Sequence, residues 1–199
     1  MVRGHVRAAA ILIVATALTM GTLRGSAAAQ TKLNVPSNGF PIKIGKSGSY
    51  IVAANLVATS KNNNIINVTV PNVLINLNGF RVGGPGSGGT AIGINANGQA
   101  NVTIENGSVS GMGADGILLG NNGVVRNVQA NNNGGNGINC QGTGCLVTGC
   151  TANSNGTSGL NFADDTSGYH ENVMTGNTTA AVSGGTNMGA NVCNGVLCP

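Results

Sequence analysis

The chain has 199 residues, of which nine are Lys or Arg, five are Asp or Glu, 34 are Gly and only 3% are aromatic. Three of the nine cations lie within residues 1–29, so the remainder carries six basic residues against five acidic ones. That remainder has the length of one domain and no basic patch that could neutralise a row of phosphates, which excludes nucleic acid as an expected partner.

Residues 1–29 have the pattern of a secretory signal peptide. A basic start precedes an apolar run at residues 8–20, and residues 27–29 offer an A-x-A cleavage site before Gln30. An uncleaved anchor is the alternative, but the run is short for a bilayer span. No later segment is long and apolar enough to span one. We therefore expect a secreted or periplasmic protein with no membrane contact after cleavage.

The next segments alternate between short apolar stretches and turns. Residues 30–46 are expected to form an N-terminal extension that precedes the folded domain. Residues 49–59, 64–70 and 73–77 are rich in Val and Ile and favour strands. The glycine-rich residues 83–89 indicate a loop over the surface, and the absence of a strand–loop–helix context argues against a phosphate-binding loop.

A repeat of about 22 residues runs through the second half of the chain. One short phrase recurs at residues 91–94, 116–119, 137–140 and 159–162. A period of this length, with Asn and Gly between short apolar strands, predicts a β-solenoid. Side chains two apart share a face of a strand. We therefore expect two inward columns, one of Ile92, Ile117, Ile138 and Leu160 and one of Ile94, Leu119, Cys140 and Phe162.

Three segments and the repeated x-Gly-Ile phrase resemble a known family. Val73-Leu74-Ile75-Asn76-Leu77-Asn78-Gly79-Phe80, Asn101-Val102-Thr103-Ile104-Glu105-Asn106-Gly107 and the ending Asn187-Met188-Gly189-Ala190-Asn191-Val192-Cys193 resemble bacterial proteins of the pectin-lyase-like superfamily. The resemblance covers roughly residues 47–198. It implies an all-β fold, a single-stranded right-handed parallel β-helix of five to seven coils over residues 47–190. Residues 191–199 would form a disulfide-pinned tail. The superfamily includes lyases, glycosidases, epimerases, esterases and adhesins, so the fold alone selects no activity.

Asp164, Asp165 and His170 are the candidate catalytic residues. Paired carboxylates can divide the acid and base roles when their environments separate their pKa values. An Asp pair near a His resembles the β-helical polygalacturonases, but the Asn-Thr-Asp, Gly-His-Gly and Arg-Ile-Lys signatures of that family are missing. The alternative is that residues 162–168 form a polar turn between coils.

The candidate substrate-binding residues are Glu105, Arg126 and Glu171, which align with Thr148 in one outward column at nearly constant intervals. We expect Glu105 and Arg126 to face solvent on adjacent coils and to pair. The structural alternative is an exposed salt bridge. Calcium requires several convergent oxygens and no Asp-rich repeat is present, so neither a metal site nor a cofactor is expected.

A second outward surface consists of Gly93, Leu118, Asn139 and Asn161 on the repeated strands. It has no charge and no aromatic side chain. Sugar-binding grooves usually offer aromatic platforms, which counts against tight glycan binding on this face.

All five cysteines lie after residue 139. Cys140 with Cys145 and Cys193 with Cys198 have the same short spacing, so two local disulfides are the most economical pairing in an exported protein. Cys150 would remain a buried thiol. A zinc site is the alternative, although no Cys-x-x-Cys pair supports it.

Two functions are compatible with these features. The favoured one is an exported, non-catalytic carbohydrate- or surface-interaction module. The sparse charge and the missing catalytic signatures support it. The alternative is a small polysaccharide-active enzyme, a lyase, glycoside hydrolase or epimerase, that acts on an acidic polysaccharide. A polysaccharide is the expected partner in both.

Overall fold

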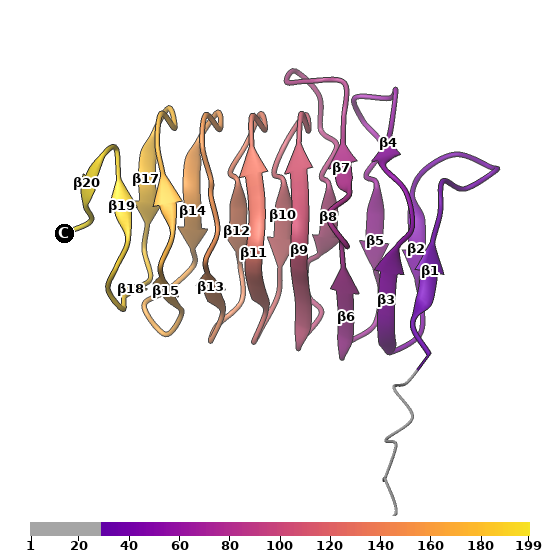
Figure 1. The fold of residues 1–199 in the computed structure, drawn as a ribbon, viewed down its shortest axis with the longest axis horizontal. Coiled ribbons are helices and arrows are strands. Elements are labelled where there is room, and N and C mark those ends of the chain that lie inside the picture. The colour runs from indigo at the N-terminus through magenta and orange to yellow at the C-terminus, as the bar shows by residue number, and fades with distance from the viewer. Residues whose placement is uncertain (1–28) are drawn as a thin grey trace, which may run out of the picture.

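The computed structural model describes residues 29–199 as an all-β fold (Figure 1). The expected signal peptide and its charges lie outside these residues, apart from Ala29. No helix occurs in the described part, and hence none that could cross a membrane. The strands are β1 (Thr31–Leu33), β2 (Ile42–Ile44), β3 (Gly48–Val52), β4 (Leu56–Val57), β5 (Ile66–Val68), β6 (Val73–Asn76), β7 (Arg81–Gly83), β8 (Ile94–Ala96), β9 (Val102–Ser110), β10 (Ile117–Leu119), β11 (Val124–Asn131), β12 (Ile138–Cys140), β13 (Leu146–Thr148), β14 (Ser158–Phe162), β15 (Gly168–His170), β16 (Val173–Met174), β17 (Ala180–Ser183), β18 (Thr186–Asn187), β19 (Val192–Cys193) and β20 (Val196–Leu197).

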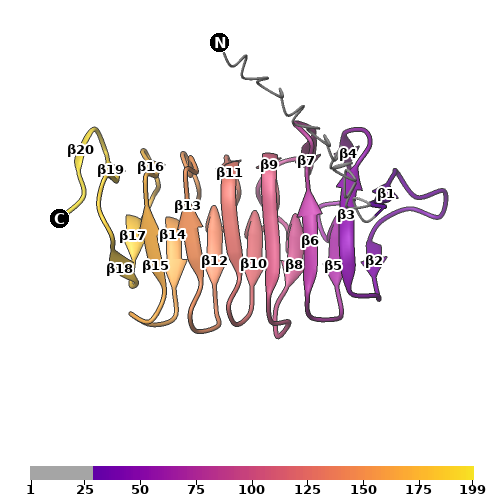
Figure 2. The ribbon, with the colours of Figure 1, turned by 60° about the horizontal axis from the view of Figure 1, so that its bottom comes forward.

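The strands stack into a parallel β-solenoid of about seven turns, as the sequence predicts. One sheet has the order β1-β3-β6-β9-β11-β13-β15-β18, with β4 and β7 beside it, and the second has the order β17-β14-β12-β10-β8-β5-β2. Figures 1 and 2 show the coils side by side from β1 and β2 at one end to β19 and β20 at the other. Among the strands of residues 29–199, only the terminal pair β19 and β20 is antiparallel.

The stack begins earlier than expected. β1 pairs with β3 and β2 pairs with β5, both in parallel, so residues 31–44 belong to the solenoid and are not an extension that precedes it. Leu33 and Ile44 are buried in the core at that end. Neither segment repeats the later phrase, which explains why the sequence pattern missed the first coil.

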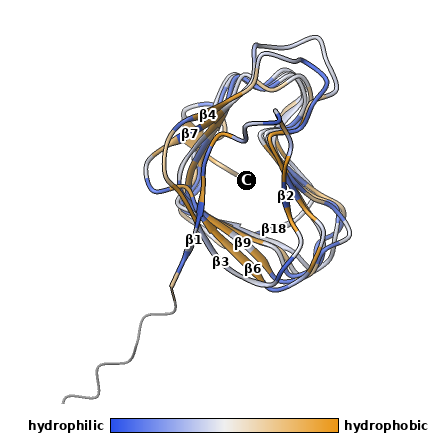
Figure 3. Ribbon diagram, turned by 90° about the vertical axis from the view of Figure 1, so that its right-hand side faces the viewer, coloured by the Kyte–Doolittle hydropathy of each residue, from blue (hydrophilic) through white to orange (hydrophobic). Residues whose placement is uncertain are grey.

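The interior is a continuous apolar column, and Figure 3 shows the coils superposed along the axis. The expected columns are displaced by two positions in one coil, because Ile117 pairs with Ile94 and not with Ile92. The observed columns are Ile94, Ile117, Ile138 and Leu160, and beside them Ala96, Leu119, Cys140 and Phe162.

Glycine packing explains this register. Gly93, Gly116, Gly137 and Gly159 precede the first inward residue of each strand, and a Cβ on any of them would lie 2.5–2.7 Å from the carbonyl oxygen of the next coil. Only glycine lets the backbones approach so closely. The glycine column therefore selects Ile94, which follows Gly93, as the first inward residue.

The coil register near the C-terminal end also differs from the sequence alignment. The outward column is Glu105, Arg126, Thr148 and His170, so Glu171 is not a member. Glu171 instead occupies a left-handed corner with φ of 58°, in line with Asn106, Asn127 and Gly149 on earlier coils. The coil that leads from Thr148 to His170 is thus one residue shorter than the alignment assumed.

The shorter coil also changes the core. Asn172 is buried at the inward position of this coil, and the next residue, Val173, is 39% exposed. The Asn172 amide is satisfied there, because its Oδ1 accepts from the backbone N–H of Cys150 and its Nδ2 donates to the carbonyl of Val147.

Candidate functional site

The outer face of the seven-stranded sheet carries one continuous row of side chains, which we call the amide row. The strand register places these residues one coil apart, from the β2 end of the stack onward: Lys43, Asn67, Asn95, Leu118, Asn139, Asn161 and Ser183. Asn95 therefore takes the place that the sequence alignment assigned to Gly93. Adjacent strands lie ~4.8 Å apart. The row contains two pairs of amides, Asn67 with Asn95 and Asn139 with Asn161, which the buried Leu118 separates.

A groove of about 380 Å³ lies on the first part of this row. It is lined by Asn67, Val68, Thr69, Asn95, Asn97 and Gln99, which come from two adjacent coils and from the turn that follows each strand. No aromatic or charged side chain is among them, so hydrogen bonding is the main interaction that this groove can offer.

The amides in the groove are held in a fixed orientation. Asn64 Nδ2 donates to Asn67 Oδ1 at 2.8 Å, and the backbone N–H of Asn97 donates to Asn95 Oδ1 at 3.0 Å. Both amide oxygens are thus engaged within the protein, and both NH₂ groups remain available as donors. A ligand rich in acceptor oxygens, such as a sugar hydroxyl or ring oxygen, fits this arrangement.

Further along the row the amides hydrogen-bond one another. Asn161 Nδ2 donates to Asn139 Oδ1 at 2.9 Å, and Asn139 Nδ2 donates to Asp115 Oδ2 at 2.7 Å. The other Asp115 oxygen accepts the backbone N–H and the side-chain amide of Asn136. Asp115 is therefore a structural acceptor, and this part of the row is more rigid than the groove.

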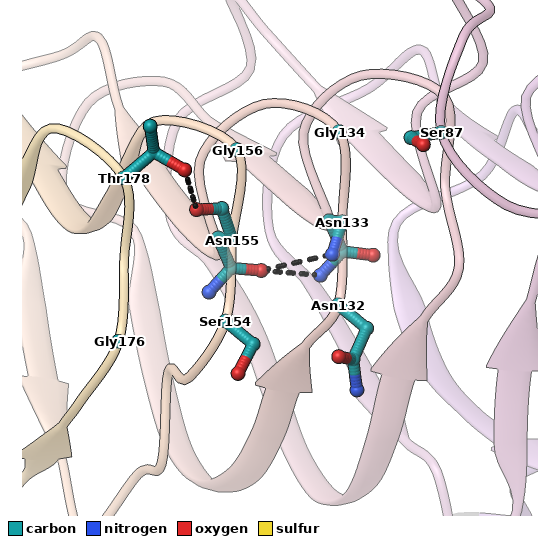
Figure 4. A pocket seen from close by; sticks show the side chains of 9 residues that line it. All are labelled: Ser87, Asn132, Asn133, Gly134, Ser154, Asn155, Gly156, Gly176 and Thr178. Atoms are coloured by element: carbon teal, nitrogen blue, oxygen red, sulfur yellow. Dashed lines mark hydrogen bonds between the residues drawn. The ribbon is translucent and has the colours of Figure 1, made fainter.

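A second groove, of about 350 Å³, lies over the turns that lead into the same sheet (Figure 4). Its floor contains the buried Asn133 and Asn155, which belong to a ladder of asparagines. Asn155 Oδ1 accepts from the N–H and the Nδ2 of Asn133, and Asn155 Nδ2 donates to Oδ1 of the half-buried Asn177 at 3.0 Å. Asn132 and Ser154 are exposed on its wall, where Figure 4 shows no bond between them and the other lining residues. The floor maintains the stack, while the wall offers one amide and one hydroxyl to solvent.

The candidate catalytic residues are placed in a turn and at a strand end. Asp164 Oδ1 accepts the N–H of Thr166 at 3.1 Å and its hydroxyl at 2.7 Å, which is the local bonding of a turn. Asp165 is exposed. The His170 ring at the end of β15 lies with Nδ1 3.5 Å from Thr148 Oγ1 and 3.8 Å from Glu171 Oε2. Within residues 29–199, Glu171 is the one carboxylate paired with the His170 ring. The expected pairing of His170 with Asp164 or Asp165 is therefore not observed.

The Glu105–Arg126 pair forms as the sequence predicts. Glu105 Oε2 accepts from Arg126 Nε at 2.7 Å and Glu105 Oε1 accepts from Asn76 Nδ2 at 3.1 Å. The expectation that both residues face solvent is wrong for Glu105, which is only 8% exposed because Asn76 and Arg126 cover it from either side. Its carboxylate is engaged within the sheet, and Glu171 lies outside this column. No three His, Cys, Asp or Glu side chains in the described part of the chain gather closely enough to hold a metal ion.

The cysteines follow the prediction in part. Cys193 and Cys198 form a disulfide with an S–S distance of 2.07 Å, whereas Cys140, Cys145 and Cys150 are buried thiols. The expected Cys140–Cys145 disulfide is thus not formed: the Cys145 thiol donates to the Gly120 carbonyl at 3.3 Å. A hydrogen bond with Cys145, together with burial, raises the pKa of the Cys140 thiol well above its usual range. Burial raises the pKa of the Cys150 thiol from 9.0 to about 11.

Comparison of the chain with protein-family models, with curated proteins and with solved structures gave no match. The function is therefore inferred from the surface of the solenoid. Sequence reasoning missed Lys43, Asn67, Asn95 and Gln99, because they lie in coils whose lengths depart from the repeat. The fixed strand register that brings them into one row could not be derived from the period alone.

Proposed function

We propose that this chain is an exported, non-catalytic module that binds a polysaccharide along the amide row. One observation carries the proposal: Asn67 and Asn95 line a groove of about 380 Å³, and their amide oxygens accept bonds from within the protein, which leaves both NH₂ groups available to a ligand. A polysaccharide offers acceptor oxygens at repeated intervals, and an extended ligand can follow strands that repeat at ~4.8 Å.

The missing aromatic platform bears on the strength of binding. Neutral hydrogen bonds to an exposed ligand are each worth only ~0.5–1.5 kcal/mol. We therefore expect weak binding of short oligosaccharides and stronger binding of chains long enough to contact several coils at once. A surface of this kind suits the retention of a polymer more than the capture of a small sugar.

Export is supported by the signal-like residues 1–29 and by the Cys193–Cys198 disulfide, since disulfides persist in oxidising compartments. A right-handed β-helix of the pectin-lyase-like type is the family assignment that we propose for the solenoid, on the basis of the resembling segments.

Glycoside hydrolysis by the usual mechanism would require two carboxyl groups about 5–10 Å apart that face one substrate position. Asp164 is occupied by Thr166, and His170 pairs with Glu171. These contacts favour the binding module over a glycoside hydrolase that uses the Asp164–Asp165 pair.

The deciding experiment measures binding and turnover on one panel of neutral and uronic polysaccharides. We expect a retained complex, no turnover, and at least about tenfold weaker binding for the Asn67→Ala/Asn95→Ala variant. Gln129→Ala, an exposed change on the other large sheet, serves as the matched control and should bind normally. Unchanged binding by the double variant would refute the amide row as the site. Turnover that falls on Asp165→Ala would instead establish the enzyme.

A further inference from the structure

Charge is separated along the axis of the solenoid. Residues 29–104 contain five basic residues and no acidic one, namely Lys32, Lys43, Lys46, Lys61 and Arg81. Residues 105–199 contain one basic residue, Arg126, against five acidic ones, namely Glu105, Asp115, Asp164, Asp165 and Glu171. Because the coils follow one another along the stack (Figure 1), one end of the molecule is positive and the other is negative. The polysaccharide-binding proposal does not explain this separation.

The charges reach close to both ends. Lys32 and Lys43 are exposed on β1 and β2, the terminal strands of the two large sheets. Asp165 and Glu171 are exposed on either side of β15, and β15 is one coil from the terminal strand β18. One coil is ~4.8 Å, well inside the screening length of ~10 Å at moderate salt, so these acids contribute to the electrostatic potential at that end.

Four of the six exposed large apolar side chains in the described residues also lie near the ends. Val35 is 55% exposed beside the first coil, and Met188, Val196 and Leu197 are 60–74% exposed close to the C-terminus. A cavity of about 380 Å³ opens at that C-terminal end, lined by Tyr169, Ala181, Val182, Gly184, Gly185, Cys193, Cys198 and Pro199. Large apolar side chains clustered on a surface mark a contact site more often than scattered ones do.

Both ends of the seven-stranded sheet finish on an edge strand. β17 pairs only with β14, and β2 pairs only with β5, among the strands of the described residues. An edge strand presents unpaired N–H and C=O groups to a partner. Since every strand of this sheet runs in the same direction, β2 of one molecule can approach β17 of another without reversing the order of the stack.

We propose that the partner of these ends is a second copy of this chain, bound head to tail. The basic β1–β2 end of one copy would lie against the acidic C-terminal end of the other, which consists of β17, β18 and the β19–β20 hairpin. Opposite charges, exposed apolar side chains and parallel edges agree on this orientation and disfavour head-to-head contact, which would oppose like charges. The contact is heterologous, so it can repeat into a short filament. Such a filament would continue the amide row from one copy to the next.

The test is sedimentation velocity of the exported chain, without polysaccharide, over a range of protein and salt concentrations. We expect the weight-average mass to rise with protein concentration at low salt and to fall as salt screens the contact. Lys43→Glu and Asp165→Lys should each weaken self-association by about tenfold, because each places like charges at the contact. Gln129→Glu/Gln141→Glu changes the net charge by the same amount as Lys43→Glu, at exposed positions away from the ends, and should associate normally.

A mixture of the two charge variants provides the sharpest outcome. In the mixture, the unchanged β1–β2 end of Asp165→Lys can bind the unchanged C-terminal end of Lys43→Glu, so the mixture should recover association that each variant alone has largely lost. Circular dichroism verifies that each variant is folded. A monomer at every concentration and salt would overturn the proposal, as would association that neither charge variant weakens. Because no glycan is present, either result leaves the polysaccharide-binding proposal to its own experiment.

Discussion

The two halves of the solenoid use different coil lengths, and this difference decides which side chains can stack. In the first half the coils are long and unequal, and equivalent residues such as Asn76 and Glu105 are 29 apart in the sequence. In the second half the interval is nearly constant, at 21 from Glu105 to Arg126 and 22 from Thr148 to His170.

Equal coils place equivalent turns above one another, so the amide of Asn133 meets that of Asn155 and the latter meets Asn177. Unequal coils give isolated contacts instead, such as that of the Asn64 amide oxygen with the backbone N–H of Ile92. A regular period thus allows a continuous polar ladder, which an irregular one interrupts.

The largest expected difference between the two halves follows from removing Asn155, the central member of the asparagine ladder. Asn155→Ala leaves the buried N–H of Asn133 and the carbonyl of Ala130 without the partners that they have now. At ~1–3 kcal/mol for each orphaned group, we expect a loss of about 3–5 kcal/mol in the free energy of unfolding, measured in urea. Asn64→Ala in the irregular half should lose only about 1 kcal/mol, because its surroundings are half-exposed.

Asn132→Gly is the control for the ladder, since Asn132 lies in the same turn, is exposed and has a φ of 56° that glycine adopts readily. A similar loss in the free energy of unfolding for Asn64→Ala and Asn155→Ala would contradict this prediction. It would show that the ladder of the regular half is no more stabilising than an isolated contact.

The junction of the halves is tested by Ile94→Ala. Ile94 is fully buried between coils, so truncation removes apolar contacts and leaves a cavity, and we expect a loss of about 2–4 kcal/mol in the free energy of unfolding. Ile92→Ala is the matched comparison, because Ile92 is only half-buried and should lose less than about 1.5 kcal/mol. If Ile92→Ala proved the more damaging change, the strand register at β8 would be off by two positions.

The buried thiols of the regular half make stability depend on alkaline pH. The pKa of Cys150 is about 11 in the folded chain and 9.0 when unperturbed, so the folded state holds its proton more tightly. The resulting stabilisation is complete below pH 9 and is lost as the pH rises through 11. By pH 11 the free energy of unfolding should have fallen by about 2 kcal/mol. Denaturant unfolding between pH 8 and pH 11 measures it.

The informative quantity is the difference between the wild-type chain and Cys150→Ala, because every other group contributes equally to both. That variant should show a shallower fall of stability with pH. Equal slopes in both proteins would mean that Cys150 is not buried as a neutral thiol.

The smallest change in stability is expected at Glu105, which accepts hydrogen bonds from Asn76 in the first half and from Arg126 in the second. The Arg126 side chain is 49% exposed, so Arg126→Ala should lower the free energy of unfolding by no more than about 1 kcal/mol. The loss should shrink at about 1 M salt, where exposed charges are screened. A loss above about 3 kcal/mol that salt leaves unchanged would indicate a buried ion pair instead.

The sequence by itself determined the repeat, the solenoid and the identity of most inward residues. Alternation of small turn residues with apolar strand residues leaves only one way to bury Ile117, Ile138 and Leu160 together, namely parallel stacking. The Glu105–Arg126 pair and the Cys193–Cys198 disulfide were also predictable, because both depend on short, regular separations along the chain.

Only the tertiary structure decided what happens where the period changes. A coil of unusual length can be aligned in more than one way. Backbone packing at Gly93 places Ile94, and not Ile92, in the inward column with Ile117. The coil length likewise places His170, and not Glu171, beside Thr148. Cys140 and Cys145 remain thiols. Spacing limits which residues can meet, but the carbonyls and side chains of the adjacent coil determine which of them do.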